Sequence, residues 1–150
     1  MRAKTLFVDS IAILFIILWV YAAVSKLFDY NNFSIELGKA PLLSGFAPVI
    51  AVGIPFLEIA LAIMLLVERT KFIALVLSSS LLLLFTVYLF IILNYSSYIP
   101  CSCGGILGRL GYKEHIFFNL ILFALGIASI LLYQKENQHN QTKYNNLSVH

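Results

Sequence analysis

Four long apolar runs are the feature that most constrains how this chain can fold. They cover approximately residues 6–24, 46–67, 72–93 and 116–133, and charged or polar residues close each of them. A helix of about 20 apolar residues crosses the roughly 30 Å hydrocarbon layer of a bilayer, because each helical residue rises about 1.5 Å. The sequence therefore predicts an all-α integral membrane protein, a bundle of four transmembrane helices.

The composition agrees with this interpretation. The chain is 61% hydrophobic and 11% charged, whereas a soluble domain is about 45–50% apolar and about 25% charged. Its net charge of +3 comes from ten basic and seven acidic residues that are dispersed along the chain. No basic block is dense enough to bind nucleic acid, so membrane lipid is the expected surrounding partner.

The pattern divides the chain into one helical domain, residues 1–133, and a polar tail, residues 134–150. The tail is poor in aliphatic residues, so we expect it to be disordered. A signal peptide is the rival interpretation of the first run, because Arg2 and Lys4 precede it and small residues occupy positions 22–25. The length of the run favours a membrane-spanning helix.

The distribution of basic residues predicts the orientation, since cytoplasmic loops of membrane proteins are enriched in Lys and Arg. Six basic residues flank the helix ends on the side of both termini: Arg2, Lys4, Arg69, Lys71, Lys135 and Lys143. Four lie at the opposite ends: Lys26, Lys39, Arg109 and Lys113. We therefore expect a multi-pass protein of the inner (plasma) membrane with both termini in the cytoplasm and the connection after residue 93 outside it.

That connection contains Cys101 and Cys103, the only cysteines of the chain, preceded by Pro100 and followed by Gly104–Gly105. A disulfide between residues i and i+2 would be strained, and a strained disulfide is easily reduced. The alternative is two inert residues in a turn. A closed zinc site normally takes four ligands, and His115 is the only nearby histidine, so we expect no metal site.

Charged and polar residues near the spans are candidates for a buried site. Glu58 is the only ionisable residue deep within a predicted span, where a carboxylate usually faces the bundle interior and has a partner. Lys26 has a stem long enough to reach it, but Asp29 could instead pair with Lys26 at i, i+3 spacing. His115 and Asn119 share one helix face at i, i+4 spacing; they either support the cysteines or make ordinary headgroup and interhelical contacts.

Three motifs occur in order along the chain: residues 22–29 with Phe33, residues 55–58, and residues 100–105 followed by His115, Phe118 and Asn119. In combination they resemble the MauE branch of the DoxX-like family, small four-helix membrane proteins, over approximately residues 6–133. The resemblance implies thiol-disulfide chemistry outside the cytoplasm, in maturing a disulfide-rich secreted protein alongside a thioredoxin-like partner. It makes Cys101 and Cys103 the redox pair, and it implies supporting positions at Lys26, Asp29, Glu58, His115 and Asn119.

The resulting hypothesis is a thiol-disulfide oxidoreductase whose attacking species is a thiolate. Arg109, Lys113 and a protonated His115 would favour that anion. No nucleotide, haem or flavin fingerprint is present. A quinone or a second dithiol protein is the candidate electron acceptor, and Tyr88, Phe117 and Phe118 either contact a quinone or face lipid and core.

Two further functions remain open. A non-enzymatic membrane scaffold for a secreted or membrane partner would not need the cysteines. A small-molecule transporter component would use Glu58 as its intramembrane site.

Overall fold

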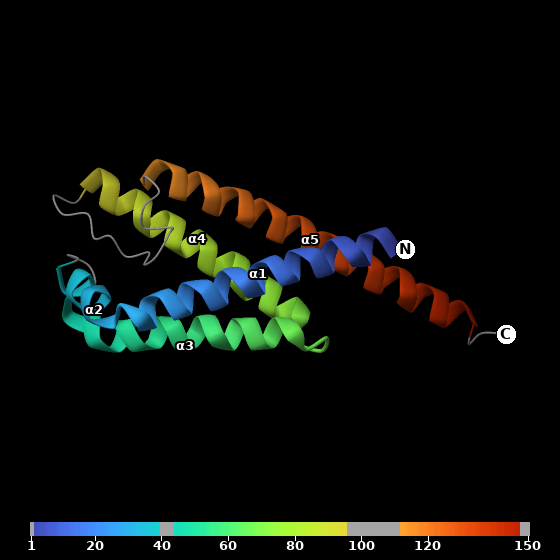
Figure 1. The fold of residues 1–150 in the computed structure, drawn as a ribbon. Coiled ribbons are helices and arrows are strands. Elements are labelled where there is room, and N and C mark those ends of the chain that lie inside the picture. The colour runs from blue at the N-terminus through green and yellow to red at the C-terminus, as the bar shows by residue number, and fades with distance from the viewer. Residues whose placement is uncertain (1, 40–43, 96–111, 148–150) are drawn as a thin grey trace.

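The computed structural model describes residues 2–39, 44–95 and 112–147 (Figure 1). Its helices are α1 (Arg2–Phe28), α2 (Tyr30–Lys39), the short 3-10 helix η1 (Ser44–Phe46), α3 (Ala47–Leu66), α4 (Lys71–Tyr95) and α5 (Tyr112–Leu147). No strand occurs within these described ranges. The all-α prediction is confirmed.

Among the described residues, four helices are long and apolar enough to cross a membrane: Thr5–Phe28, Ser44–Leu66, Lys71–Ile91 and Glu114–Lys135. Large apolar side chains are exposed on the outer faces of all four, including Ile17, Val49, Ile63, Leu84 and Leu131. A water-soluble monomer rarely exposes apolar surface on this scale, whereas hydrocarbon is a good solvent for it. The protein is therefore a multi-pass membrane protein.

The two ends of the bundle consist of different helix ends and connections. Figure 1 shows the start of α1, the turn between α3 and α4 and the later half of α5 at one end. Helix α2, the end of α4 and the start of α5 lie at the other end. The helices thus alternate in direction, as short connections between neighbouring helices require.

The core forms where one face of each helix meets its neighbours. Buried positions recur every three or four residues, which is the spacing of one helix face. On α1 they are Val8, Ile11, Ala12, Phe15, Trp19 and Ala23, and on α3 they are Ala51, Pro55, Glu58, Leu61, Ala62 and Leu65. This spacing places a lysine at position 26 of α1 and a glutamate at position 58 of α3 on facing inner surfaces.

Small and polar residues bring α4 and α5 close together. A Cβ atom added at Gly126 of α5 would overlap the hydroxyl oxygen of Ser79 on α4, and it would lie 3.1 Å from Phe15 Cζ. Small residues allow such close approach, which is how helices associate in lipid. Phe72 and Tyr133 stack nearer the termini, with ring centroids 5.7 Å apart.

Helix α2 is a structure that the sequence did not predict, because residues 25–45 contain no long apolar run. Backbone hydrogen bonds from Asp29 N to Ser25 O (3.3 Å) and from Phe33 N to Asp29 O (3.0 Å) join it to α1. Phe33 and Leu37 are buried against the start of α3, whereas most other α2 side chains are exposed. This one-sided burial closes the end of the bundle away from the termini.

The tail also differs from the expectation of disorder, because α5 continues as a helix to Leu147. The apolar span within it ends at Lys135. Lys, Glu and Gln are good helix formers, and extending an existing helix avoids the cost of nucleation. A polar sequence can therefore remain helical after the membrane-spanning part has ended.

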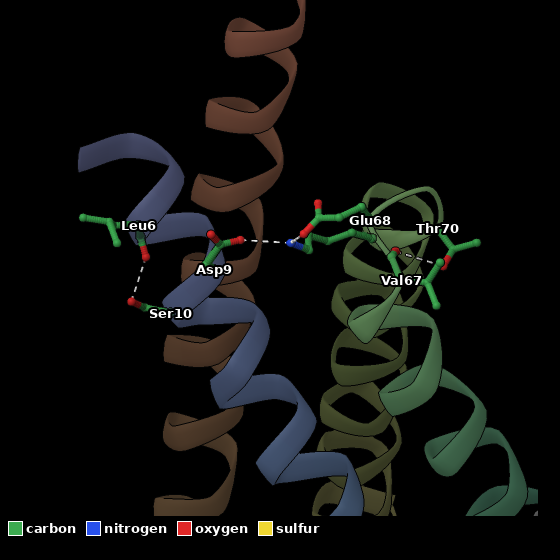
Figure 2. A network of polar contacts seen from close by, with 7 residues as sticks. Leu6, Asp9, Ser10, Val67, Glu68 and Thr70 are labelled. Atoms are coloured by element: carbon green, nitrogen blue, oxygen red, sulfur yellow. Dashed lines mark hydrogen bonds and ion pairs between the residues drawn. The ribbon is translucent and has the colours of Figure 1, made fainter. Parts of the chain in front are cut away.

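Lys71 joins helices at the end that holds the termini, and Figure 2 labels its partners Asp9 and Glu68. Its ammonium donates to Asp9 Oδ1 of α1 at 2.9 Å and also to Glu68 in the turn that precedes α4. Lys71 is buried, but Asp9 and Glu68 remain 45% and 78% exposed. In the same turn the Thr70 hydroxyl lies 2.7 Å from the carbonyl oxygen of Met64 and 3.2 Å from that of Val67, and the Met64 carbonyl is an acceptor in the last turn of α3.

Candidate functional site

A buried ion pair lies at the centre of the candidate site. Lys26 Nζ of α1 donates to Glu58 Oε1 of α3 at 2.6 Å, and also to the backbone carbonyl of Ala22 at 3.3 Å. Glu58 is 0% exposed and Lys26 is 8% exposed. The Lys26–Glu58 interaction, one of the two pairings that the sequence left open, is therefore present, and it balances the two charges inside the bundle.

Local sequence explains how both groups reach this position. Lys26 lies in the last turn of α1, and α2 then folds back so that the Phe33 ring centroid lies 6.0 Å from the ammonium. A lysine over an aromatic face gains a cation–π attraction. In α3, the buried Pro55 lies three residues before Glu58 on the same face. The ion pair is thus enclosed by α1, α2 and α3 together.

Asp29 does not act as the partner of Lys26. Its Oδ1 accepts a hydrogen bond from Asn32 Nδ2 at 2.8 Å, and both residues are exposed. The pairing with Lys26 at i, i+3 spacing was thus the wrong one of the two alternatives. The reason is that Lys26 lies on the inner face of α1 whereas Asp29 occupies the exposed junction with α2.

The ion pair borders a cavity of about 420 Å³. All five α-helices contribute to its wall, from the later half of α1 to the first turns of α5. Its lining is mostly aliphatic and aromatic, and the polar-tipped or charged residues in it are Tyr21, Lys26, Glu58, Tyr88, His115 and Asn119. An apolar cavity with a few converging polar groups is typical of a small-molecule site.

Two polar atoms of this wall have no hydrogen-bond partner among the described residues. They are Glu58 Oε2 and the hydroxyl oxygen of Tyr88, and both atoms are buried. An unsatisfied buried polar atom costs about 1–3 kcal/mol, and more when it is charged. Because Glu58 and Tyr88 line the cavity, these two atoms are its candidate hydrogen-bonding groups for a ligand.

The other predicted polar positions divide between the cavity and the surface. His115 and Asn119 of α5 both line the cavity, with Asn119 buried. Among the aromatic residues suggested for a quinone, Tyr88 lines the cavity, whereas Phe117 is 67% exposed and Phe118 packs on the main core. Four of the five predicted supporting residues thus share one cavity, and Asp29 lies outside it.

Cys101, Cys103 and Arg109 lie outside the described residues, as do Pro100 and the two glycines of that motif. The chain leaves the described part at Tyr95, at the end of α4, and re-enters it at Tyr112, at the start of α5. His115 is in the first turn of α5.

Sequence reasoning missed several buried polar residues. Trp19 Nε1 donates to Ser78 Oγ at 2.9 Å, and this bond joins α1 to α4 beside the cavity. Ser79 and Ser129 are also buried. The signal was available in part, since serine within an apolar run commonly marks a helix contact. Asp9 likewise interrupts the first run and needed a partner, which the structure identifies as Lys71.

Comparison with known proteins gives a family for the chain. A search of curated proteins and a search of solved structures found no match. The family model described as "Methylamine utilisation protein MauE" matches residues 4–133, which include all four candidate spans except the final turn of the last. Because that match covers most of the chain, the protein belongs to the MauE family.

Proposed function

We propose that this protein performs thiol-disulfide exchange through Cys101 and Cys103 and so supports disulfide formation in an extracytoplasmic partner. The observation that carries the proposal is the position of the two cysteines, the only ones in the chain, between Tyr95 and Tyr112. Figure 1 shows these helix ends at the same end of the bundle as α2. Residues of α2, of the end of α1 and of the start of α5 line the cavity beside the ion pair. Membership in a family described by methylamine utilisation is consistent with a role in maturing a secreted enzyme.

The proposed exchange has two steps, and in each a partner thiolate attacks a disulfide. A partner thiolate attacks the Cys101–Cys103 disulfide, which gives a mixed disulfide and releases one cysteine as a thiol after proton uptake. A second partner thiolate then attacks the mixed disulfide, so the partner gains a disulfide and Cys101 and Cys103 become a dithiol. Two electrons have moved from the partner to this protein. A thioredoxin-like protein or a secreted substrate has the required thiols.

The orientation is part of the same proposal. Six basic residues flank the helix ends near the termini and four flank the opposite ends, a bias that favours cytoplasmic termini. The cysteines then face the extracytoplasmic side of the inner membrane, where disulfides persist. The ion pair between Lys26 and Glu58 would hold α1 and α3 in place beneath them, and His115 and Asn119 would contribute polar groups from α5.

The test is a trapping experiment in the cells of origin. Cys103→Ser leaves a single thiol at Cys101, which can attack the disulfide of an oxidised partner in the reverse of this exchange but has no second thiol to release it, so we expect a covalent partner adduct on non-reducing gels. The adduct should disappear on reduction and should be absent from the Cys101→Ser/Cys103→Ser double variant. Ser102→Ala is the matched control in the same segment, and it should give the wild-type pattern.

Sidedness is measured on the same cells with a maleimide that does not cross the membrane. After mild reduction the maleimide should label wild-type protein and Ser102→Ala, and it should not label the double variant. Failure to label either cysteine from outside would contradict the orientation. A double variant that matures secreted disulfide proteins as well as wild type would favour a scaffold instead.

A further inference from the structure

We infer that the cavity beside Lys26 and Glu58 is a binding site for the ring of an isoprenoid quinone and its quinol. Three observations carry the inference: the apolar lining, the balanced ion pair, and the two buried polar atoms that lack partners. The site consists of described residues alone, and it includes neither cysteine.

The charged residues that line the cavity favour a neutral ligand. Lys26 and Glu58 are the only ionic residues that line the described cavity, and they neutralise one another at 2.6 Å. A charged ligand would add an unbalanced charge to a low-dielectric interior, which is costly. A neutral molecule with a largely apolar body has no such penalty and can enter from the lipid.

The two buried atoms without hydrogen-bond partners indicate which polar groups the ligand would carry. Glu58 Oε2 can accept a hydrogen bond from a hydroxyl, and the Tyr88 hydroxyl can donate to a carbonyl. A quinol offers ring hydroxyls, and a quinone offers carbonyls at the same positions. The wall thus contains a suitable group for each redox form.

The aromatic residues that line the cavity favour a ligand with a planar ring. Trp19, Phe33 and Phe85 line the cavity with Tyr21 and Tyr88, and aromatic side chains favour offset or edge contacts with a ring. The volume of about 420 Å³ is within the usual range for small-molecule sites, about 300–1,000 Å³. A saturated acyl chain would leave both polar atoms unsatisfied.

A bound quinone would accept the electrons of the exchange proposed above, and this half of the inference rests on that proposed function. The dithiol of Cys101 and Cys103 loses two electrons and two protons and becomes a disulfide. The quinone gains both electrons and both protons and becomes a quinol. The protein is then ready for another partner, and the quinol leaves into the lipid.

Trp19 provides a direct binding assay, because it is the only tryptophan in the chain and lines the cavity. Quinones quench indole fluorescence at short range. Purified protein in quinone-free detergent micelles is titrated with decylubiquinone, and we expect quenching that saturates. Tyr88→Phe retains the ring and removes the hydroxyl, so it should weaken the apparent affinity for the quinone roughly 5- to 10-fold, the value of one hydrogen bond.

A cavity-filling pair gives the matched control. Ala22 lines the cavity, so Ala22→Phe should abolish the saturable quenching. Ala60 is exposed on α3 and does not line the cavity, so Ala60→Phe should bind as wild type does. Thermal unfolding of each variant shows whether it is folded, and Ala60→Phe shows whether an added phenyl group alone disturbs the signal.

The outcomes separate the two proposals. Fluorescence quenching that rises linearly with decylubiquinone concentration in every variant would overturn the quinone site. So would displacement of decylubiquinone by 1-decanol at the same concentrations, because 1-decanol has no quinone ring. The double cysteine-to-serine variant should bind decylubiquinone as wild type does, whether or not the thiol function is correct. Saturable binding without quinol formation by the reduced wild-type protein would overturn the electron-acceptor half and leave the binding site in place.

Discussion

Replacing Lys26 by methionine is expected to destabilise the protein by about 3–5 kcal/mol, because removal of one partner leaves a buried charge unpaired. Glu58 is 0% exposed and one of its oxygens already lacks a partner. Lys26 is the one Lys or Arg among the described residues that line the cavity beside this carboxylate, so its removal leaves the charge there uncompensated. Reversible unfolding of the purified protein in mixed micelles with increasing denaturing detergent measures the loss.

Two variants make this prediction specific. Lys71→Met removes another buried lysine that joins two helices, but its partners Asp9 and Glu68 are partly or mostly exposed. Those carboxylates remain solvated, so the loss should be about 1 kcal/mol or less. Lys26→Met combined with Glu58→Leu removes both buried charges and should recover most of the stability. Equal losses in both lysine variants, or an additive double variant, would contradict the role of the buried pair.

Gly126→Val should destabilise the contact between α4 and α5 by about 1–3 kcal/mol, the usual cost of overpacking. The first added carbon would already overlap the Ser79 hydroxyl oxygen and approach Phe15 Cζ at 3.1 Å. Valine adds two further methyl groups to that space. We expect a lower midpoint of thermal unfolding in detergent.

Gly53→Val is the matched control, because Gly53 is also in a membrane-spanning helix and no atom lies within 4 Å of an added Cβ there. Its unfolding midpoint should stay the same or rise, since glycine weakens a helix interior. Gly126→Ala adds only the first carbon, which already overlaps the Ser79 hydroxyl oxygen. Ser79→Ala removes that oxygen, so combining it with Gly126→Ala should restore part of the lost stability. A similar fall for both glycine-to-valine variants would show that close packing at Gly126 is not the cause.

The membrane-spanning helices and the ion pair could be predicted from the sequence for one physical reason. Charges are rare and costly in hydrocarbon, so long apolar runs define the spans, and Glu58, deep within one of them, needs a partner such as Lys26 at the end of another. The sequence thus offered Glu58 as one of two partners for Lys26. The cavity could not be predicted in this way, because it depends on how five helices pack and on which side chains fall short of filling the space between them.

The errors have equally local causes. Helix α2 is short and its apolar face is narrow, with Phe33 and Leu37 as its buried residues, so its sequence resembles a polar loop. The choice between Asp29 and Glu58 as partner of Lys26 depended on the fold of that same segment. The helical continuation of α5 beyond Lys135 depends on the helix that precedes it, not on the polar residues alone.

The extension of α5 to Leu147 gives the molecule a short, stiff stalk beyond the bilayer. At about 1.5 Å per residue, the part after Lys135 reaches roughly 18 Å from the end of the apolar span. A fluorophore attached near Leu147 would be held at a defined height above the headgroups. Its energy transfer to labelled lipid would thus report the tilt of α5, and a flexible tether would not.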